Sequence, residues 1–306
     1  MTSVTVRVPA KINLQLAVGP PRPDGYHGLV TVFHAVSLFD EVTVTPARTD
    51  SVIVTGEGAG LVPEDGDNLA LRAVRVLRQA LAKRAGTAAP GGVAITIAKR
   101  IPVAGGMAGG SADAAAALVA CNELWGTGLP EPDLCALGSQ VGSDVAFAVL
   151  GNTAIGQGRG ELLTPVPTPA KTTYHWVLAL ADGHLSTPRV FRELDRQRQS
   201  SEATEPALSK ELMEALNAGD PRKLGTALTN DLQEPALTLF PALRKTLAAG
   251  IEAGALGALV SGSGPTCFFL AETADQATTL ANVLESAGVS RAVTSATGPA
   301  PGATVL

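Results

Sequence analysis

Alternating hydrophobic and polar residues predict β-strands in the first half of the chain. β-Branched or alternating positions recur in five segments that we expect to form a sheet: Val4–Val8, Val30–Val36, Glu41–Thr45, Val52–Glu57 and Val93–Ala98. Apolar residues three or four positions apart, as at Leu71, Val74, Leu77 and Leu81, instead predict helices. The helical segments are Leu69–Lys83, Ala112–Leu124 and Glu131–Val141. This mixture predicts an α+β fold rather than a regular β-α-β alternation.

The second half shows the same mixture after a proline-containing connector at Leu163–Pro169. Its predicted strands are Tyr174–Ala181, Ala255–Val260, Cys267–Ala271 and Arg291–Ser295. Its predicted helices begin at Thr187, with Pro188 in the first helical position, and near Lys210–Leu216, Pro241–Ala253 and Ala274–Ser286, with a polar loop at Gln197–Pro206. Two helices over a small antiparallel sheet would suit this order. We place a domain boundary at the connector, giving domains 1–165 and 166–306.

Composition and charge narrow the class of protein. The 306 residues are 45% hydrophobic and 17% charged, which is typical of a folded chain long enough for two domains. A net charge of -5 gives no sequence-wide positive field for nucleic acid or an anionic membrane, so an anionic ligand must be held locally. The sequence has no leader pattern, no apolar run that would span a bilayer and no paired cysteine spacing. We therefore expect a cytoplasmic protein that binds neither nucleic acid nor membranes.

The most informative segment is a glycine-rich loop between a strand and a helix. Val93–Ala98 leads through Lys99–Pro102 into Gly105–Ser111, and an alanine-rich helix follows at once. Glycines let the backbone approach an anion, and a helix N-terminus adds a positive dipole end, so this order is typical of phosphate sites. Ser111 stands where a helix cap or a phosphate or metal contact would be. The spacing fits neither the Walker A loop nor the dinucleotide fingerprint, and a simple packing turn is the alternative.

Three motifs in order resemble those of the GHMP kinases, which bind ATP in a glycine-rich loop. Pro9–Leu14 resembles the first motif, Pro102–Asp113 the second and Leu259–Thr266 the third. The resemblance implies a two-domain fold, with an N-terminal domain like ribosomal protein S5 domain 2 and a ferredoxin-like C-terminal domain. It also implies an ATP-dependent small-molecule kinase with its active site in the cleft, where the third motif supports the glycine loop.

Further residues point to one branch of that family. Lys11 and Asn13 in the first motif, together with Asp24-Gly25-Tyr26-His27 and Gly142-Ser143-Asp144-Val145, resemble the branch that phosphorylates the 2-hydroxyl of a cytidine-diphosphate-linked methylerythritol. That reaction is a step of the non-mevalonate route to isoprenoids. A homoserine- or mevalonate-type kinase of the same family, and a nucleotide-binding protein without kinase activity, are the alternatives.

The resemblance assigns roles residue by residue. Lys11 and Asp144 would be catalytic, and the acceptor would contact Asn13, Tyr26, His27, Thr187 and Phe191. ATP would contact Asn68, Lys99, Pro102, Ala104, Gly105, Gly106, Met107, Ala108, Gly109, Gly110, Ser111 and Asp113. Mg²⁺ is implied as a cofactor without assigned ligands, and the chain would be a monomer or weak homodimer. Ala112 and Asp113 replace a serine and an asparagine or serine that relatives often carry, which leaves the adenine-side and metal-side contacts open.

Several of these residues also have ordinary structural interpretations. If Ile12, Leu14 and Leu16 face the core, alternation places Lys11, Asn13 and Gln15 on the opposite face, where a lysine is usually solvated. Asn68 and Asp144 each precede a helix and suit an N-cap. Asp24-Gly25 is a common turn pair. His34, His175 and His184 have no metal-ligand spacing and are interpreted as structural.

Overall fold

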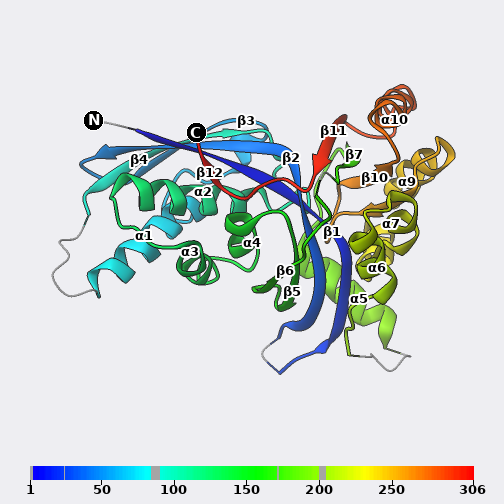
Figure 1. The fold of residues 1–306 in the computed structure, drawn as a ribbon, viewed down its shortest axis with the longest axis horizontal. Coiled ribbons are helices and arrows are strands. Elements are labelled where there is room, and N and C mark those ends of the chain that lie inside the picture. The colour runs from blue at the N-terminus through cyan, green and yellow to red at the C-terminus, as the bar shows by residue number, and fades with distance from the viewer. Residues whose placement is uncertain (1–2, 24, 84–89, 171, 200–204) are drawn as a thin grey trace.

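The structure, a computed structural model, describes residues 3–23, 25–83, 90–170, 172–199 and 205–306. Two lobes lie side by side, and each has a sheet covered by helices (Figure 1). Asp24 and residues 200–204 of the predicted polar loop lie outside the described residues. Within the described ranges, no helix combines the length and apolar character needed to cross a membrane.

The first lobe contains a sheet whose described strands follow the order β12-β1-β2-β4-β3, with β5 and β6 continuing from β2 and β8 beside β1. Its strands are β1 (Val4–Pro21), β2 (His27–Ala47), β3 (Ser51–Gly56), β4 (Gly92–Lys99), β5 (Thr153–Gly158), β6 (Leu162–Pro165), β8 (Thr229–Asn230) and β12 (Thr304–Val305). Helices pack below this sheet in Figure 1: α1 (Leu69–Ala82), α2 (Gly109–Leu124), α3 (Glu131–Gly138) and α4 (Val145–Leu150). A short 3-10 helix, η1 (Ala59–Leu61), follows β3. The predicted apolar stripe of α1 is buried in this core, which confirms the helical periodicity.

The second lobe contains an antiparallel sheet in the order β11-β7-β10-β9. Its strands are β7 (Tyr174–Leu180), β9 (Gly257–Val260), β10 (Cys267–Ala271) and β11 (Ala292–Gly298). The helices of this half are α5 (Thr187–Arg198), α6 (Lys210–Ala218), α7 (Pro221–Ala227), α8 (Gln233–Leu239), α9 (Ala242–Glu252) and α10 (Ala274–Ser286). The predicted strands and the α+β class are confirmed, whereas α7 and α8 were not predicted. The boundary at residues 165 and 166 stays a prediction, and β8 and β12 return to the first sheet.

Two strands that the sequence separates are one strand in the structure. Val30–Val36 and Glu41–Thr45 both lie in β2, because residues 37–40 between them form a bulge and not a turn. Pro9 pairs with Phe39 and Ala10 with Val36, so two residues of β2 are skipped in the register. Such a bulge bends a strand without ending it. The bend lets β2 pair with β5 at one end and with β4 at the other.

Two predicted helix boundaries were also wrong. Helix α2 begins at Gly109, three residues before the predicted start, with Ala108 at the N-cap. Ser111 therefore lies in the first helical turn and not at the cap. Helix α3 ends at Gly138, short of the predicted Val141, and a Cβ at Gly138 would lie only 2.9 Å from Val145 Cγ1.

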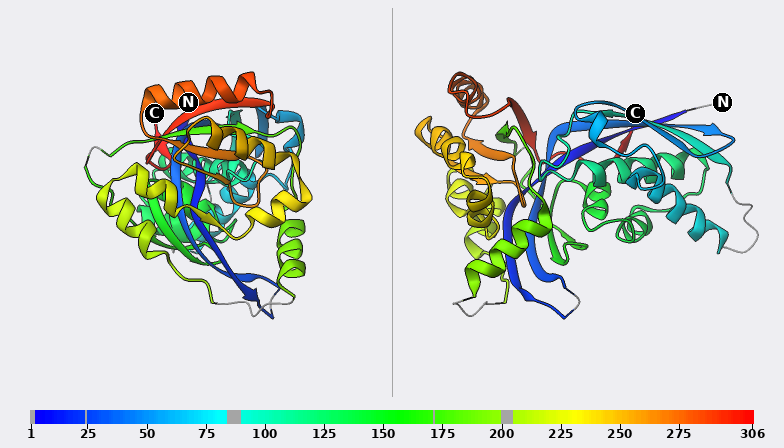
Figure 2. Two further views of the ribbon diagram at one scale, coloured as in Figure 1. Left: turned by 90° about the vertical axis from the view of Figure 1, so that its right-hand side faces the viewer. Right: turned by 180° about the vertical axis from the view of Figure 1, so that it is seen from behind.

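Strand β1 connects the two cores. Ile12 and Leu14 are buried in a cluster that extends from the first lobe to one face of the second sheet, where it includes Trp176, whereas Leu16 and Val18 belong to a second cluster on the other face of that sheet. Figure 2 shows β1 and β2 running together from the first lobe toward α5 of the second. Both lobes therefore share one continuous strand, and the residues near its middle lie between them.

Candidate active site

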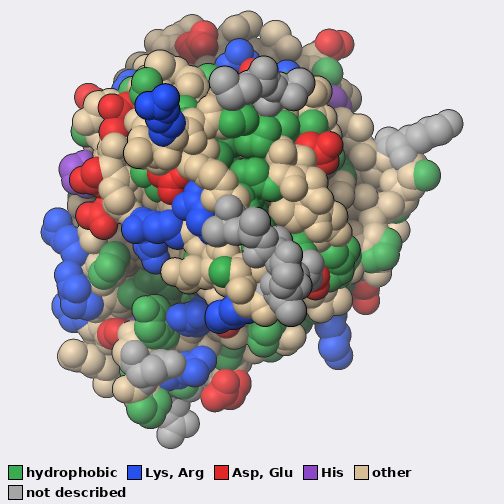
Figure 3. Space-filling model, turned by 90° about the vertical axis from the view of Figure 1, so that its left-hand side faces the viewer, with side chains coloured by type: hydrophobic (Ala, Val, Ile, Leu, Met, Phe, Trp, Pro, Cys, Tyr) green, Lys and Arg blue, Asp and Glu red, His purple; other side chains and the backbone are tan. Residues whose placement is uncertain are grey.

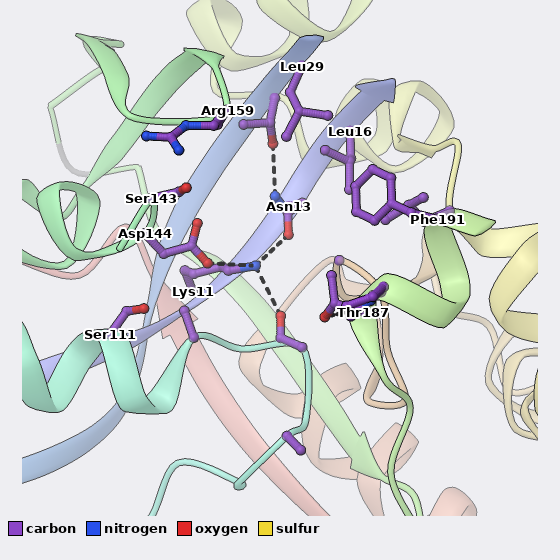
Figure 4. Close-up of a pocket in the computed structure, with 18 of the residues that line it drawn as sticks. Lys11, Asn13, Leu16, Leu29, Ser111, Ser143, Asp144, Arg159, Thr187 and Phe191 are labelled. Carbon is purple, nitrogen blue, oxygen red and sulfur yellow. Dashed lines mark hydrogen bonds and ion pairs between the residues drawn. The ribbon is translucent and has the colours of Figure 1, made fainter. Parts of the chain in front are cut away.

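A cleft of about 820 Å³ lies between the lobes. Its lining includes most of the residues that the sequence singles out: Lys11, Asn13, Tyr26, His27, Pro102, Ala104, Gly105, Gly106, Ala108, Gly109, Gly110, Ser111, Asp144, Thr187 and Phe191. Figure 4 shows Ser111 and Asp144 on one side of the Lys11 ammonium, and Thr187 and Phe191 on the other. Met107 is the exception in the loop, because its side chain is fully buried in the first core.

The glycine loop has a backbone conformation that suits an anion. Ala104, Gly106 and Ala108 have φ values of 53°, 76° and 60°, alternating with residues outside the left-handed region. Alternation of this kind turns successive N–H groups toward one side, and the N-terminus of α2 follows directly. A left-handed alanine costs about 1–2 kcal/mol, and strain of this kind is typical of functional loops. The loop therefore fits a phosphate group.

The third motif packs directly on this loop, as the resemblance predicts. The Gly106 carbonyl accepts hydrogen bonds from Ser261 Oγ and from Lys11 Nζ, each at 3.0 Å. The Gly105 carbonyl accepts from the Thr266 amide at 3.3 Å. A Cβ at Gly106 would lie 2.1 Å from the Ser261 carbonyl oxygen, so only glycine allows this approach. The second lobe thus supports the loop at its midpoint.

Lys11 and Asp144 face each other across the cleft, with Lys11 Nζ 3.9 Å from Asp144 Oδ2 (Figure 4). Lys11 Nζ also donates to Asn13 Oδ1 at 2.8 Å, and Asn13 Nδ2 donates to Thr31 Oγ1 at 2.8 Å. Lys11 and Asn13 are on the face opposite Ile12, as alternation predicts, but that face is buried in the cleft instead of solvated. Burial lowers the pKa of Lys11, and the Asp144 charge opposes that shift.

Asp144 occupies the N-cap position of α4, as predicted, but its side chain makes no capping hydrogen bond. Its carboxylate points toward Lys11 instead (Figure 4), with 31% of the side chain exposed to the cleft. The carboxylate is therefore available to a ligand.

Helix α5 presents a stripe of residues to the other side of the cleft. Thr187, Phe191 and Asp195 are four residues apart and so share one helical face. Thr187 Oγ1 is 2.8 Å from Ser263 Oγ, the Phe191 ring centroid is 5.0 Å from that of His27, and Asp195 Oδ1 is 2.8 Å from His27 Nε2. Sequence reasoning missed Asp195, although its spacing of four from Phe191 is a signal, whereas Ser263 belongs to the third motif that the resemblance places at the cleft.

Arg159 and Arg192 are further residues that sequence reasoning missed. Arg159 lies at the turn between β5 and β6, lines the cleft and holds its Cζ 5.3 Å from the centroid of the Tyr26 ring. Arg192, on α5, also lines the cleft. These two guanidinium groups place positive charge at the same end of the cleft as His27 and Phe191. No local motif marks either arginine in the sequence.

A smaller cavity of about 250 Å³ adjoins the cleft and shares Leu69, Ala104 and Gly110 with it. Asn68 lines it and caps α1 as predicted, accepting from the Ala70 amide at 2.9 Å. Asn68 also donates to the Pro63 carbonyl at 2.7 Å. The cavity lies beside the glycine loop, where a base attached to bound phosphates would fit.

Lys99 and Asp113 line the same cavity, but they form a buried ionic cluster with Asp40. Lys99 Nζ donates to Asp40 Oδ2 at 2.6 Å and to Asp113 Oδ2 at 2.7 Å. Asp40 also accepts from the Arg100 and Ile101 amides, so it fixes the chain where β4 enters the glycine loop. Burial raises the pKa of Asp113 to about 8 despite Lys99. The Lys99 ammonium is thus already bonded to Asp40 and Asp113, so we expect it to support the shape of the cavity instead of contacting a ligand directly.

A metal ion held by the protein alone would require several ligating side chains close together. Among the residues that the structure describes, no three His, Cys, Asp or Glu side chains gather where they could hold a metal ion. Mg²⁺ in phosphate-transferring sites keeps several waters and takes few protein ligands besides the phosphates. Among the residues that line the cleft, Ser111 supplies a hydroxyl at the start of α2.

Charges of both signs are mixed on one end of the molecule. On the end of the first lobe shown in Figure 3, Lys and Arg side chains are interspersed with Asp and Glu side chains.

Comparison with known proteins identifies the family. Residues 68–152 match the model of the GHMP kinases N terminal domain, and residues 212–290 match that of the GHMP kinases C terminal domain. The chain is 56% identical to a 4-diphosphocytidyl-2-C-methyl-D-erythritol kinase of Thermobifida fusca, covering 100% of this chain and 99% of the relative. A relative of the same name from Streptomyces coelicolor is 55% identical, with 99% of each chain covered.

Solved structures agree with this assignment. The crystal structure of a 4-(cytidine 5'-diphospho)-2C-methyl-D-erythritol kinase matches with a TM-score of 0.76 at 33% identity, covering 95% of this chain and 98% of the other. A homoserine kinase from Cytophaga hutchinsonii has the same TM-score at only 20% identity, covering 100% and 98%, and so shares the fold alone. The chain therefore belongs to the GHMP kinase family, in the branch formed by its 4-diphosphocytidyl-2-C-methyl-D-erythritol kinase relatives.

Proposed function

We propose that this protein transfers the γ-phosphate of ATP to the 2-hydroxyl of 4-diphosphocytidyl-2-C-methyl-D-erythritol. The observation that carries the proposal is the Lys11–Asp144 pair at the centre of a cleft that has a phosphate-type loop on one side and His27 and Phe191 on the other. Full-length relatives at more than half identity bear the corresponding name, which supports the same acceptor. The reaction supplies the non-mevalonate route to isoprenoid precursors.

The acceptor hydroxyl would lie between Lys11 and Asp144. Asp144 orients the hydroxyl and takes its proton as the oxygen forms a bond to the γ-phosphorus and the bond to the β,γ-bridging oxygen breaks. Lys11 places a positive charge beside the transferring group, where negative charge is spread over the phosphoryl oxygens. Asn13 holds the Lys11 ammonium in position through the 2.8 Å hydrogen bond.

The donor would occupy the glycine loop and the smaller cavity. The N–H groups of the loop and of the first turn of α2 bind the phosphates, and Asn68 lies where the base would fit. Mg²⁺, when bound, supplies charge neutralisation to the phosphates, with Ser111 as the side chain placed to help hold it. The contacts between Ser261 and Gly106 keep the loop in this shape before the donor arrives.

The acceptor side of the cleft favours a large, flat and anionic substrate. Phe191, His27 and Tyr26 offer aromatic surfaces to a base, and stacking on such a surface is worth about 1–3 kcal/mol per base. Arg159 and Arg192 suit the two phosphates that link the cytidine to the polyol. Homoserine and mevalonate carry neither a base nor a diphosphate, so these groups argue against the two alternative acceptors.

An assay of phosphate transfer tests the proposal. The wild-type protein is mixed with Mg-ATP and 4-diphosphocytidyl-2-C-methyl-D-erythritol, homoserine or mevalonate in turn, and ADP release and the ³¹P spectrum of the product are followed. We expect a new phosphomonoester with the cytidine substrate alone. His27→Ala and Tyr26→Ala should raise KM for this acceptor and leave KM for ATP nearly unchanged. Turnover of homoserine or mevalonate instead, or ATP binding with no transfer to any acceptor, would overturn the proposal.

A further inference from the structure

The buried imidazole of His27 has one nitrogen already used. Its Nε2 lies 2.8 Å from Asp195 Oδ1, and only 7% of the His27 side chain is exposed. Both residues line the cleft. Within the described part of the chain, no hydrogen bond to the other nitrogen, Nδ1, is present. Nδ1 is therefore the nitrogen that a ligand in the cleft can reach.

The carboxylate decides where the proton of a neutral His27 lies. An ionised carboxylate only accepts hydrogen bonds, so the nitrogen that it contacts must carry the hydrogen. With the proton on Nε2, Nδ1 has a lone pair and acts as an acceptor. The contact also fixes the plane of the His27 ring. The Phe191 ring, whose centroid lies 5.0 Å from that of His27, packs beside it and limits its rotation.

An acceptor nitrogen in this place discriminates between pyrimidines. Cytosine carries an exocyclic amine, which donates, whereas uracil carries a carbonyl oxygen at the same position, which only accepts. Nδ1 can therefore accept a hydrogen bond from the cytosine amine, whereas the lone pair of Nδ1 would face the lone pairs of the uracil carbonyl oxygen. We propose that Asp195 is a positioning residue that holds His27 with its proton on Nε2, so that Nδ1 accepts a hydrogen bond from the exocyclic amine of the acceptor's pyrimidine. The inference rests on the proposed function for the identity of that pyrimidine.

The arrangement follows from the fold. Asp195 lies one helical turn beyond Phe191 on α5, and His27 begins β2 in the first lobe. The bond between them therefore joins the two lobes at the mouth of the acceptor site. A base that bonds to Nδ1 would therefore contact His27 of the first lobe, while Asp195 of the second lobe determines which nitrogen of His27 carries the proton.

Nitrogen spectra test the proton position without any turnover. The protein has four histidines, and the His27 resonances are assigned by their loss in His27→Asn. With ¹⁵N-labelled imidazole rings at neutral pH, we expect the His27 signals of the wild type to show protonated Nε2 and unprotonated Nδ1. In Asp195→Asn the amide can either donate or accept, so the signals should move toward a mixture of tautomers. Protonation of both nitrogens, or of Nδ1 alone, in the wild type would overturn the proposal.

Base discrimination tests the consequence. Binding of CDP and UDP is measured with the donor site saturated with a non-hydrolysable ATP analogue. The wild type should prefer CDP, and Asp195→Asn should lose about tenfold of that preference, the value of one neutral hydrogen bond. Glu193→Gln is the matched control, because Glu193 lies on the same helix but bonds to Arg196 and Gln197. It should keep the wild-type ratio.

A second variant guards against a purely structural effect. Asp195→Ala should lose the preference as Asp195→Asn does, and in the His27→Asn background neither change should have a further effect. Asp195 variants that keep the wild-type ratio of CDP to UDP affinity would refute the positioning role. Failure of the wild type to phosphorylate the cytidine acceptor would overturn the proposed function instead, and the nitrogen spectra would still decide the proton position.

Discussion

Replacing Gly110 by alanine should separate phosphate binding from folding at the glycine loop. Gly110 is the second residue of α2, is exposed to both cavities and has no left-handed φ. A Cβ there would meet only Leu69 Cδ1, at 3.4 Å, which is ordinary contact with the tip of a flexible side chain. The added methyl group therefore has room within the protein, but it stands in the space that phosphates would occupy.

The expected magnitudes follow from this geometry. Alanine stabilises a helix interior relative to glycine by about 0.5–1 kcal/mol, and less in a first turn, so the free energy of unfolding should change by less than about 1 kcal/mol. Loss of one hydrogen bond from a backbone N–H to a charged phosphate costs about 1.5–3 kcal/mol, which weakens ATP binding roughly tenfold to a hundredfold.

Calorimetry with a non-hydrolysable ATP analogue and urea unfolding measure the two quantities separately. Gly91→Ala is the matched control, because a Cβ there meets nothing within 4 Å and the residue lies outside both cavities. Gly106→Ala should behave differently and lose both stability and affinity, since its Cβ would lie 2.1 Å from the Ser261 carbonyl oxygen. If Gly110→Ala binds the analogue as tightly as the wild type does, the loop is a packing turn and does not hold phosphate.

Three further changes test the charged groups. Asp144→Asn should lower kcat by roughly 10² or more with both KM values within a few fold, as expected for a lost general base, and steady-state turnover close to wild type would exclude that role. Burial lowers the pKa of Lys11, and the Asp144 charge opposes this shift, so the alkaline fall of kcat/KM should occur at a pH below the ordinary pKa of a lysine. Asp144→Asn should move this fall to a still lower pH, and an unchanged pH profile would contradict the pairing of the two residues. Asp113 has a folded pKa of about 8 against 3.8 for a free carboxyl, so its contribution to stability is complete below 3.8 and is lost as pH rises through about 8. In urea unfolding, the free energy of unfolding of Asp113→Asn should therefore fall less than that of the wild type as the pH rises from 3.8 to about 8. Asp40→Asn breaks the buried pair with Lys99 and should lower the free energy of unfolding by about 3–5 kcal/mol over the same pH range.

The sequence was most informative where the chemistry is local. The loop from Pro102 to Ser111 could be predicted because glycine spacing, the preceding strand and the following helix are all adjacent in the chain. The contact of Ser261 with Gly106 was predictable only through the family resemblance, since 155 residues separate the two. The bulge in β2 was missed because an interruption of the alternating pattern looks the same in the sequence whether the chain turns there or merely bends within one strand.

The residues that were missed depend on tertiary pairing. Asp40 pairs with Lys99 over 59 positions, and His27 pairs with Asp195 over 168, so neither carboxylate has a partner in its own segment. The burial of Lys11 likewise could not be predicted from strand alternation, because alternation indicates which face a side chain is on but not whether a second lobe covers that face. Helical spacing from Phe191 would have marked Asp195 as a neighbour of the site, although not its partner.

The short strand β12 gives the first lobe an unusual order of assembly. Val305 pairs with Val6 and the Leu306 amide donates to the Thr5 carbonyl at 2.9 Å, so the outer edge of β1 is covered by residues almost a whole chain length away. β7, β9 and β10 all precede β12 in the chain, so most of the second sheet can form before β12 is available. The first sheet, whose strands begin to be made earliest, is thus the last to be completed. Contacts over such separations slow folding, and until they form β1 presents an open edge to other chains.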